Sequence, residues 1–117
     1  MAFKFESLKV WEKAVDLSGE ISDLVKTFPK DELYVLTSQI KRASDSISLN
    51  IAEGSTGQSN LEFKKFLGYA LRSSIEVVGC FHLARKRNLV TPQDFDLFYS
   101  KLTDLIKGIQ ALRNSIK

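Results

Sequence analysis

The sequence is poor in the residues that build disulfides and metal centres. Its 117 residues include one cysteine, one histidine and two prolines. The single cysteine, Cys80, excludes a disulfide within the chain and favours a reducing, cytoplasmic setting. His82 stands two residues from Cys80, and on a helix this spacing turns the two side chains about 200° apart. We therefore expect no metal ion held by this pair and no resident cofactor.

Long hydrophobic runs are also missing. The first residues, MAFKFESLKVWEK, are interrupted by the charges of Lys4, Glu6 and Lys9, so we expect no signal peptide. No later stretch has the length of a membrane span. With 44% hydrophobic and 26% charged residues, and no long Ser/Gly linker, the composition is typical of a soluble globular protein. We expect a single domain over residues 1–117, in the cytoplasm and away from membranes.

Apolar residues recur at steps of three and four in four segments, the spacing of amphipathic helices. The segments cover about residues 11–28, 31–53, 60–87 and 92–116. Pro29, Gly54 and the pair Thr91-Pro92 separate them, and Gly54 is expected in the left-handed position after a helix end. Ser59 and Glu62 form a predicted capping box. No segment alternates with period two, so we predict an all-α, antiparallel up-and-down four-helix bundle.

Side chains suited to catalysis are scarce. Cys80 has no base beside it and is expected to be a small buried residue, and His82 is expected to be a partly exposed bundle residue. The segment AEGSTG lacks the lysine and the spacing of a phosphate-binding loop, and no Glu-x-x-His motif is present. We therefore predict no catalytic residues, no metal and no small-molecule substrate.

A row of polar residues follows one edge of the predicted second helix. Arg42, Ser46, Asn50 and Glu53 occur at i, i+4, i+8 and i+11. If a turn near residues 55–58 reverses the chain, Arg42 lies within reach of Glu76, and Asn50 or Glu53 lies near Glu62. One interpretation is a polar seam that fixes the register of the second and third helices; the other is a surface that contacts a ligand. The seam set comprises Arg42, Ser46, Asn50, Glu53, Glu62, Ser73 and Glu76.

The same region carries a family resemblance. The stretches LKVWEKAVDL, FPKDELYVLTSQIKRASDSISLNIAEG and SNLEFKKFLGYALRSSIE resemble the four-helix-bundle or 23S rRNA intervening-sequence proteins. The resemblance runs from about Phe5 to Leu112, and Ser73 and Glu76 match the family's second motif. It implies a bundle that assembles as a ring-like homopentamer, with a role tied to RNA.

Positive charge is concentrated in the third quarter of the chain. Residues 55–90 contain six basic and two acidic side chains, and the formal net charge of the whole chain is +3. The basic set comprises Lys64, Lys65, Arg72, Arg85, Lys86 and Arg87. On a helical wheel Lys65, Arg72 and Lys86 share a side, while Lys64 and Arg85 lie elsewhere.

Two hypotheses follow from this distribution. In the first, a homo-oligomeric bundle binds RNA or a ribonucleoprotein through phosphate contacts of the basic set. In the second, the chain is a protein–protein interaction module, and its surplus apolar residues Leu49, Tyr69, Leu71 and Ile75 need covering by a partner. The identity of the ligand and the choice between RNA and DNA stay open.

Overall fold

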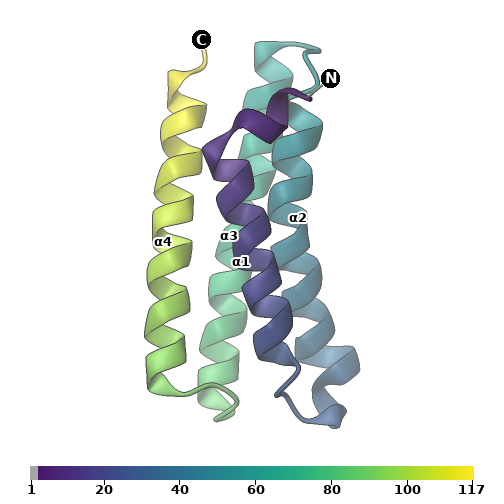
Figure 1. The fold of residues 1–117 in the computed structure, drawn as a ribbon, viewed down its shortest axis with the longest axis vertical. Coiled ribbons are helices and arrows are strands. Elements are labelled where there is room, and N and C mark those ends of the chain that lie inside the picture. The colour runs from purple at the N-terminus through teal and green to yellow at the C-terminus, as the bar shows by residue number, and fades with distance from the viewer. Residues whose placement is uncertain (1–2) are drawn as a thin grey trace.

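The structure, a computed structural model, describes residues 3–117 as an antiparallel bundle (Figure 1). Its α-helices are α1 (Lys9–Val25), α2 (Ser38–Gly54), α3 (Asn60–Lys86) and α4 (Pro92–Ser115), with the short helical turns η1 (Lys4–Ser7), η2 (Lys30–Glu32) and η3 (Leu33–Thr37). Each long helix contacts the next along the chain, and α4 returns to α1. No strand occurs among the described residues, so the predicted all-α bundle is confirmed.

Local signals in the sequence set most helix ends. The hydroxyl of Ser59 accepts a hydrogen bond from the backbone N–H of Glu62 at 3.0 Å, and Thr91 caps α4 in the same way through Asp94. The second half of the predicted capping box, from Glu62 back to Ser59, is not formed within residues 3–117. The end of α3 is closed by Asn88, whose φ of 59° lies in the left-handed region that asparagine tolerates.

The second helix starts later than predicted. The chain forms η2 and then the π-helical turn η3 before regular α2 begins at Ser38. A π turn is wider than an α turn and changes the direction of the preceding side chains. The apolar spacing that runs back from Ile40 therefore does not carry Leu33 into the core, and Leu33 is 49% exposed.

The core runs the length of the bundle and is lined by all four helices. The rings of Phe81 and Phe98 stack across it with centroids 5.1 Å apart. In α1 the buried residues are Ala14, Leu17, Ile21 and Val25. Val15, also on α1, is exposed, whereas Leu17 is buried, so only one side of the helix faces the bundle.

The contact between α2 and α3 is the most extensive in the bundle. Gly54 is the last residue of α2, and a Cβ atom there would lie 2.5 Å from the Cβ of Phe66 on α3. Glycine is thus required for close approach of the two helices. The expected left-handed conformation of Gly54 was wrong: the glycine with a positive φ, 89°, is Gly57 in the following loop.

Small polar residues also line this core. Ser44, Ser48 and Ser74 are buried, and each hydroxyl donates to a backbone carbonyl of its own helix. Because each hydroxyl group bonds within its own helix, it needs no partner on the neighbouring helix. The small serine side chains can therefore lie in the interface and allow the helices to pack tightly. No helix within residues 3–117 combines the length and the apolar character needed to cross a membrane.

Candidate nucleic-acid interface

Three of the six predicted basic residues share the outer side of α3. Lys65, Arg72 and Lys86 are exposed, and their positions on the helix direct them away from the core. None of the three forms an ion pair with another described residue. At 1.5 Å per residue they extend over roughly 30 Å of helix. They therefore form a line of unneutralised positive charge rather than a compact cluster.

The other three basic residues of the set have different surroundings. Arg87 forms an ion pair with Glu32, its Nη1 lying 3.0 Å from Oε1. Lys64 is half-buried, and its backbone carbonyl accepts a hydrogen bond from Nε of Arg113 on α4. Arg85 lies over the ring of Phe95, also on α4. The structure therefore does not bring all six residues to one face.

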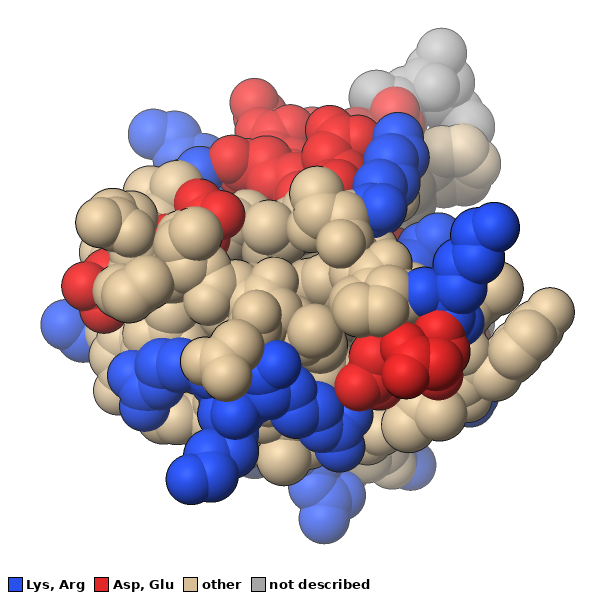
Figure 2. All heavy atoms as spheres, turned by 90° about the horizontal axis from the view of Figure 1, so that it is seen from below, with Lys and Arg blue, Asp and Glu red and all other residues tan. Residues whose placement is uncertain are grey.

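Charge is unevenly distributed at one end of the bundle. Figure 2 views the molecule from its lower end, where the largest acidic group lies on the side of α1 and the largest basic group on the opposite side, with a second acidic group at its edge. A polyanion approaching this end would be attracted to the largest basic group and repelled from the α1 side. The distribution of charge over the surface thus says more about where a polyanion would bind than the net charge of +3 does.

Part of the predicted polar seam forms a hydrogen-bond network between α2 and α3. The hydroxyl oxygens of Ser46 and Ser73 lie 2.8 Å apart. Nδ2 of Asn50 donates to the backbone carbonyl of Ser46 at 2.8 Å and to its hydroxyl at 2.9 Å. All three side chains are half-buried, where an unpaired polar group would cost more than it does in water. The network gives α2 and α3 a specific contact outside the apolar core.

Of the remaining seam residues, Arg42 and Glu76 line the same depression, as their predicted proximity requires, but they are not joined into the network. Arg42 and Glu76 are both exposed and form no ion pair; Glu76 instead accepts a hydrogen bond from the amide of Gln39 at 3.4 Å. In solvent, a pair of long charged side chains gains little from one fixed geometry.

The register of the two helices explains the other misses. The Ser46–Ser73 contact and the approach of Gly54 to Phe66 place Asn50 opposite about position 69, not near position 63. Glu62 then lies beyond the end of α2, out of reach of Asn50. Neither Glu53 nor Glu62 has a side-chain hydrogen bond within the described residues.

A shallow polar groove adjoins this network. Two neighbouring depressions of about 270 and 410 Å³ share Gln39, Arg42 and Glu76 in their walls. The first extends to Ser46 and Ser73, and the second to Tyr34, Val35 and Ser38. A guanidinium and a carboxylate lie together here, next to serine hydroxyls. The groove can therefore offer both donors and acceptors of hydrogen bonds.

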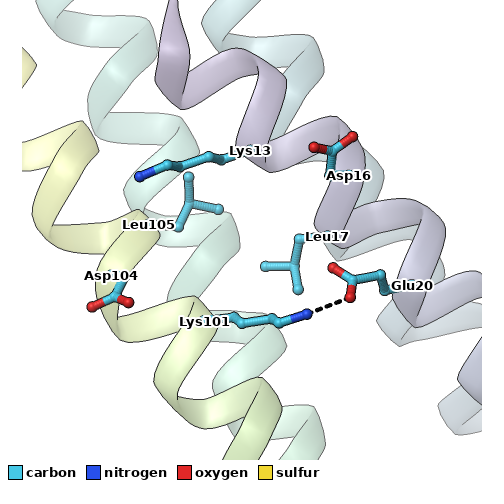
Figure 3. A pocket seen from close by; sticks show the side chains of 7 residues that line it. All are labelled: Lys13, Asp16, Leu17, Glu20, Lys101, Asp104 and Leu105. Carbon is cyan, nitrogen blue, oxygen red and sulfur yellow. Dashed lines mark hydrogen bonds and ion pairs between the residues drawn. The ribbon is translucent and has the colours of Figure 1, made fainter.

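A second groove lies between α1 and α4 (Figure 3). It has a volume of about 260 Å³, and Leu17 and Leu105 contribute apolar lining. Its charged walls are Lys13, Asp16, Glu20, Lys101 and Asp104. Lys101 reaches across to Glu20, so one basic and one acidic group neutralise each other. With carboxylates in the majority, this groove is a poor site for a polyanion.

The single cysteine is placed where it cannot act as an accessible nucleophile. Cys80 is 2% exposed in the core. Burial raises the pKa of its thiol above the ordinary value, and the nearby charge of Glu76 raises it further. Both effects favour the neutral thiol, which is the less reactive form. Among residues 3–117 no cluster of three or more His, Cys, Asp or Glu side chains is arranged to hold a metal ion.

Sequence reasoning missed an aromatic cluster at the lower end of α3 and α4. It joins His82, Arg85, Phe95 and Tyr99. The spacings Phe95–Tyr99 and His82–Arg85, four and three residues apart on their helices, were visible in the sequence. Their meeting depends on the register of α3 against α4, which the periodicity of each helix does not provide.

Comparison with known proteins agrees with this architecture. The family model of the 23S rRNA-intervening sequence protein matches residues 6–111. The chain belongs to this family. The resemblance inferred from the sequence motifs is therefore confirmed, and the match includes both the α2–α3 network and the basic side of α3.

A solved structure gives independent support for the fold of this family member. It is a protein of unknown function from the S23 ribosomal protein family of Bacteroides thetaiotaomicron VPI-5482, with a TM-score of 0.84 and 23% sequence identity. The match covers 91% of the present chain and 96% of the other. None of the curated proteins compared with the chain matches it. At this identity the likeness supports the fold alone.

Proposed function

We propose that this bundle is a non-enzymatic, RNA-associated module that binds phosphates through the outer side of α3. The observation that carries the proposal is the exposure of Lys65, Arg72 and Lys86 without ion-pair partners among the described residues. The family's name, which refers to an intervening sequence of 23S rRNA, makes RNA the first polyanion to test. Contacts of this kind detect the position and shape of phosphates with little base readout.

The test is binding of single-stranded and structured RNA, measured by fluorescence anisotropy over a salt series. Neutralising Lys65, Arg72 and Lys86 to glutamine should weaken binding and reduce the slope of log affinity against log salt by about 2, since each phosphate contact contributes about 0.7 for a single strand. The matched control replaces Lys9, Lys13 and Lys30, which are exposed and lie outside α3, and removes the same charge. If both triple variants lose affinity equally, net charge and not the α3 side governs binding. If the natural protein fails to bind at low salt, the RNA proposal is wrong.

Self-association is the second part of the proposed function, with five copies as the family resemblance implies. Leu49 on α2 and Ile75 on α3 are 65% and 62% exposed, an amount of apolar surface that a partner copy would cover. Light scattering should give a mass near five times 13.2 kDa, and replacing Leu49 and Ile75 by glutamine should lower it. A monomeric mass for the natural protein would contradict assembly. A stable oligomer that binds no RNA would favour the protein–protein interaction module.

A further inference from the structure

The lower end of α3 and α4 carries a compact set of planar side chains. The rings of Phe95 and Tyr99 stack with centroids 5.7 Å apart and an interplanar angle of 28°. The ring of His82 is steeply inclined to both, with its centroid 5.2 Å from that of Phe95 and 6.3 Å from that of Tyr99. The guanidinium carbon of Arg85 lies 3.9 Å from the centroid of Phe95. Four planar groups from two helices therefore support one another.

The inner and outer members of this cluster differ in exposure. Phe95 is 4% exposed and is anchored in the core, whereas Tyr99 is 46% exposed and His82 is also open to solvent. The side chain of Tyr99 forms no hydrogen bond with another described residue. An exposed ring that its neighbours hold in place can accept a second planar group with little loss of side-chain freedom.

One hydrogen bond orients the histidine. Nη2 of Arg85 lies 3.3 Å from Nδ1 of His82. A guanidinium can only donate, so Nδ1 accepts and the ring proton of neutral His82 resides on Nε2. The imidazole thereby presents a donor next to the exposed face of Tyr99, and Arg85 contributes positive charge beside the rings.

We propose that Tyr99, with His82 and Arg85 beside it, forms a stacking site for an unpaired nucleobase of single-stranded RNA. Aromatic rings next to cationic groups are the combination that single-strand binding proteins use, since every base has a face that can stack. The site lies at the same end of α3 as Lys86, so one strand can contact phosphate-binding and base-stacking groups together. The assignment rests on the proposed RNA function and adds an interaction that a duplex, with its bases already stacked, cannot make.

The experiment compares two ligands of equal length and charge: a single-stranded oligoadenylate and an abasic sugar–phosphate oligomer. Tyr99→Ala should weaken oligoadenylate binding about tenfold and leave abasic binding unchanged. Tyr99→Phe should retain the natural affinity, because the ring and not the hydroxyl stacks. Tyr99→Leu keeps an apolar side chain of similar bulk but removes the aromatic ring. It should weaken binding as Tyr99→Ala does, which shows that the loss is not caused by alanine loosening the local packing. Tyr34→Ala is the matched control, since Tyr34 is exposed and belongs to η3.

The outcomes separate the two proposals. If Tyr99→Ala and Tyr99→Leu bind oligoadenylate as the natural protein does, while neutralising Lys65, Arg72 and Lys86 still weakens binding, the stacking site is refuted and the phosphate interface stands. Equal losses for the abasic and base-containing oligomers would likewise refute stacking, because a base-specific contact cannot affect a ligand without bases. Binding of neither oligomer by the natural protein would overturn both proposals.

Discussion

Between α2 and α3 the helices approach so closely that Gly54 has no room for a side chain. Ser46 and Ser73 form a hydrogen bond across the contact, and Asn50 bonds to Ser46 from within α2. Between α1 and α4 the helices are close at Val10 and Gly108 but leave a groove farther along, spanned by the ion pair of Lys101 and Glu20. The first interface has a fixed geometry because backbone approach and half-buried hydrogen bonds both constrain it. The second is bridged at its groove only by exposed charges, which tolerate displacement and contribute little to stability.

The largest expected effect comes from adding one methyl group to the tight interface. In Gly54→Ala the new Cβ would clash with the Cβ of Phe66, and overpacking of this kind lowers the free energy of unfolding by about 1–3 kcal/mol. We expect the Tm to fall by about 5 °C or more in thermal unfolding followed by circular dichroism.

Gly19→Ala is the matched control for that substitution. No atom outside its own helix lies within 4 Å of a Cβ added at Gly19 on α1, so alanine should stabilise the protein by about 0.5–1 kcal/mol through its higher helix propensity. If Gly54→Ala instead stabilised the protein, α2 and α3 would be able to move apart to make room for the methyl group. The α2–α3 interface would then not have a fixed geometry.

A smaller effect is expected from breaking the hydrogen-bond network. Asn50→Ala removes two half-buried hydrogen bonds to Ser46 and should cost about 1 kcal/mol in urea unfolding. Asn114→Ala, an exposed asparagine near the end of α4, provides the control and should change stability by only a few tenths. Equal stabilities of the two variants would mean that the bonds from Asn50 to Ser46 do not strengthen the contact between Ser46 and Ser73.

The smallest effect is expected at the open interface. Glu20→Gln removes the ion pair with Lys101, which is exposed on both sides, and should change the free energy of unfolding by no more than about 0.5 kcal/mol. The difference from the natural protein should vanish at high salt because exposed charges are screened. A loss as large as that of Asn50→Ala would show that the ion pair, and not apolar packing, closes α1 against α4.

The four helices could be predicted because apolar spacing, the caps at Ser59 and Thr91, and the breaks near Pro29 and Gly54 are local features. The register of one helix against its neighbour is not a local feature, since it depends on which side chains of the two helices interdigitate. For that reason the direct contact of Ser46 with Ser73 was not predicted, and Asn50 and Glu53 were expected near Glu62, which lies beyond the end of α2. The π-helical turn before α2 has no periodic signature of its own, so the second helix was expected to start near residue 31 and not at Ser38.

The candidate interface was foreseen only in part, for the same reason. That Lys65 and Arg72 share a side follows from helical geometry alone. The engagement of Arg85 with Phe95, and the pairing of Arg87 with Glu32, join residues from different elements and could be seen only in three dimensions.

The burial of Cys80 gives the molecule an internal reporter of opening. The chain has one thiol, and it lies in the core on α3. A thiol reagent can reach it only in molecules whose helices have transiently separated, so the labelling rate measures the population of open states multiplied by the reactivity of a free cysteine. Labelling followed during ligand addition would therefore show whether binding holds the helices together, without any added probe.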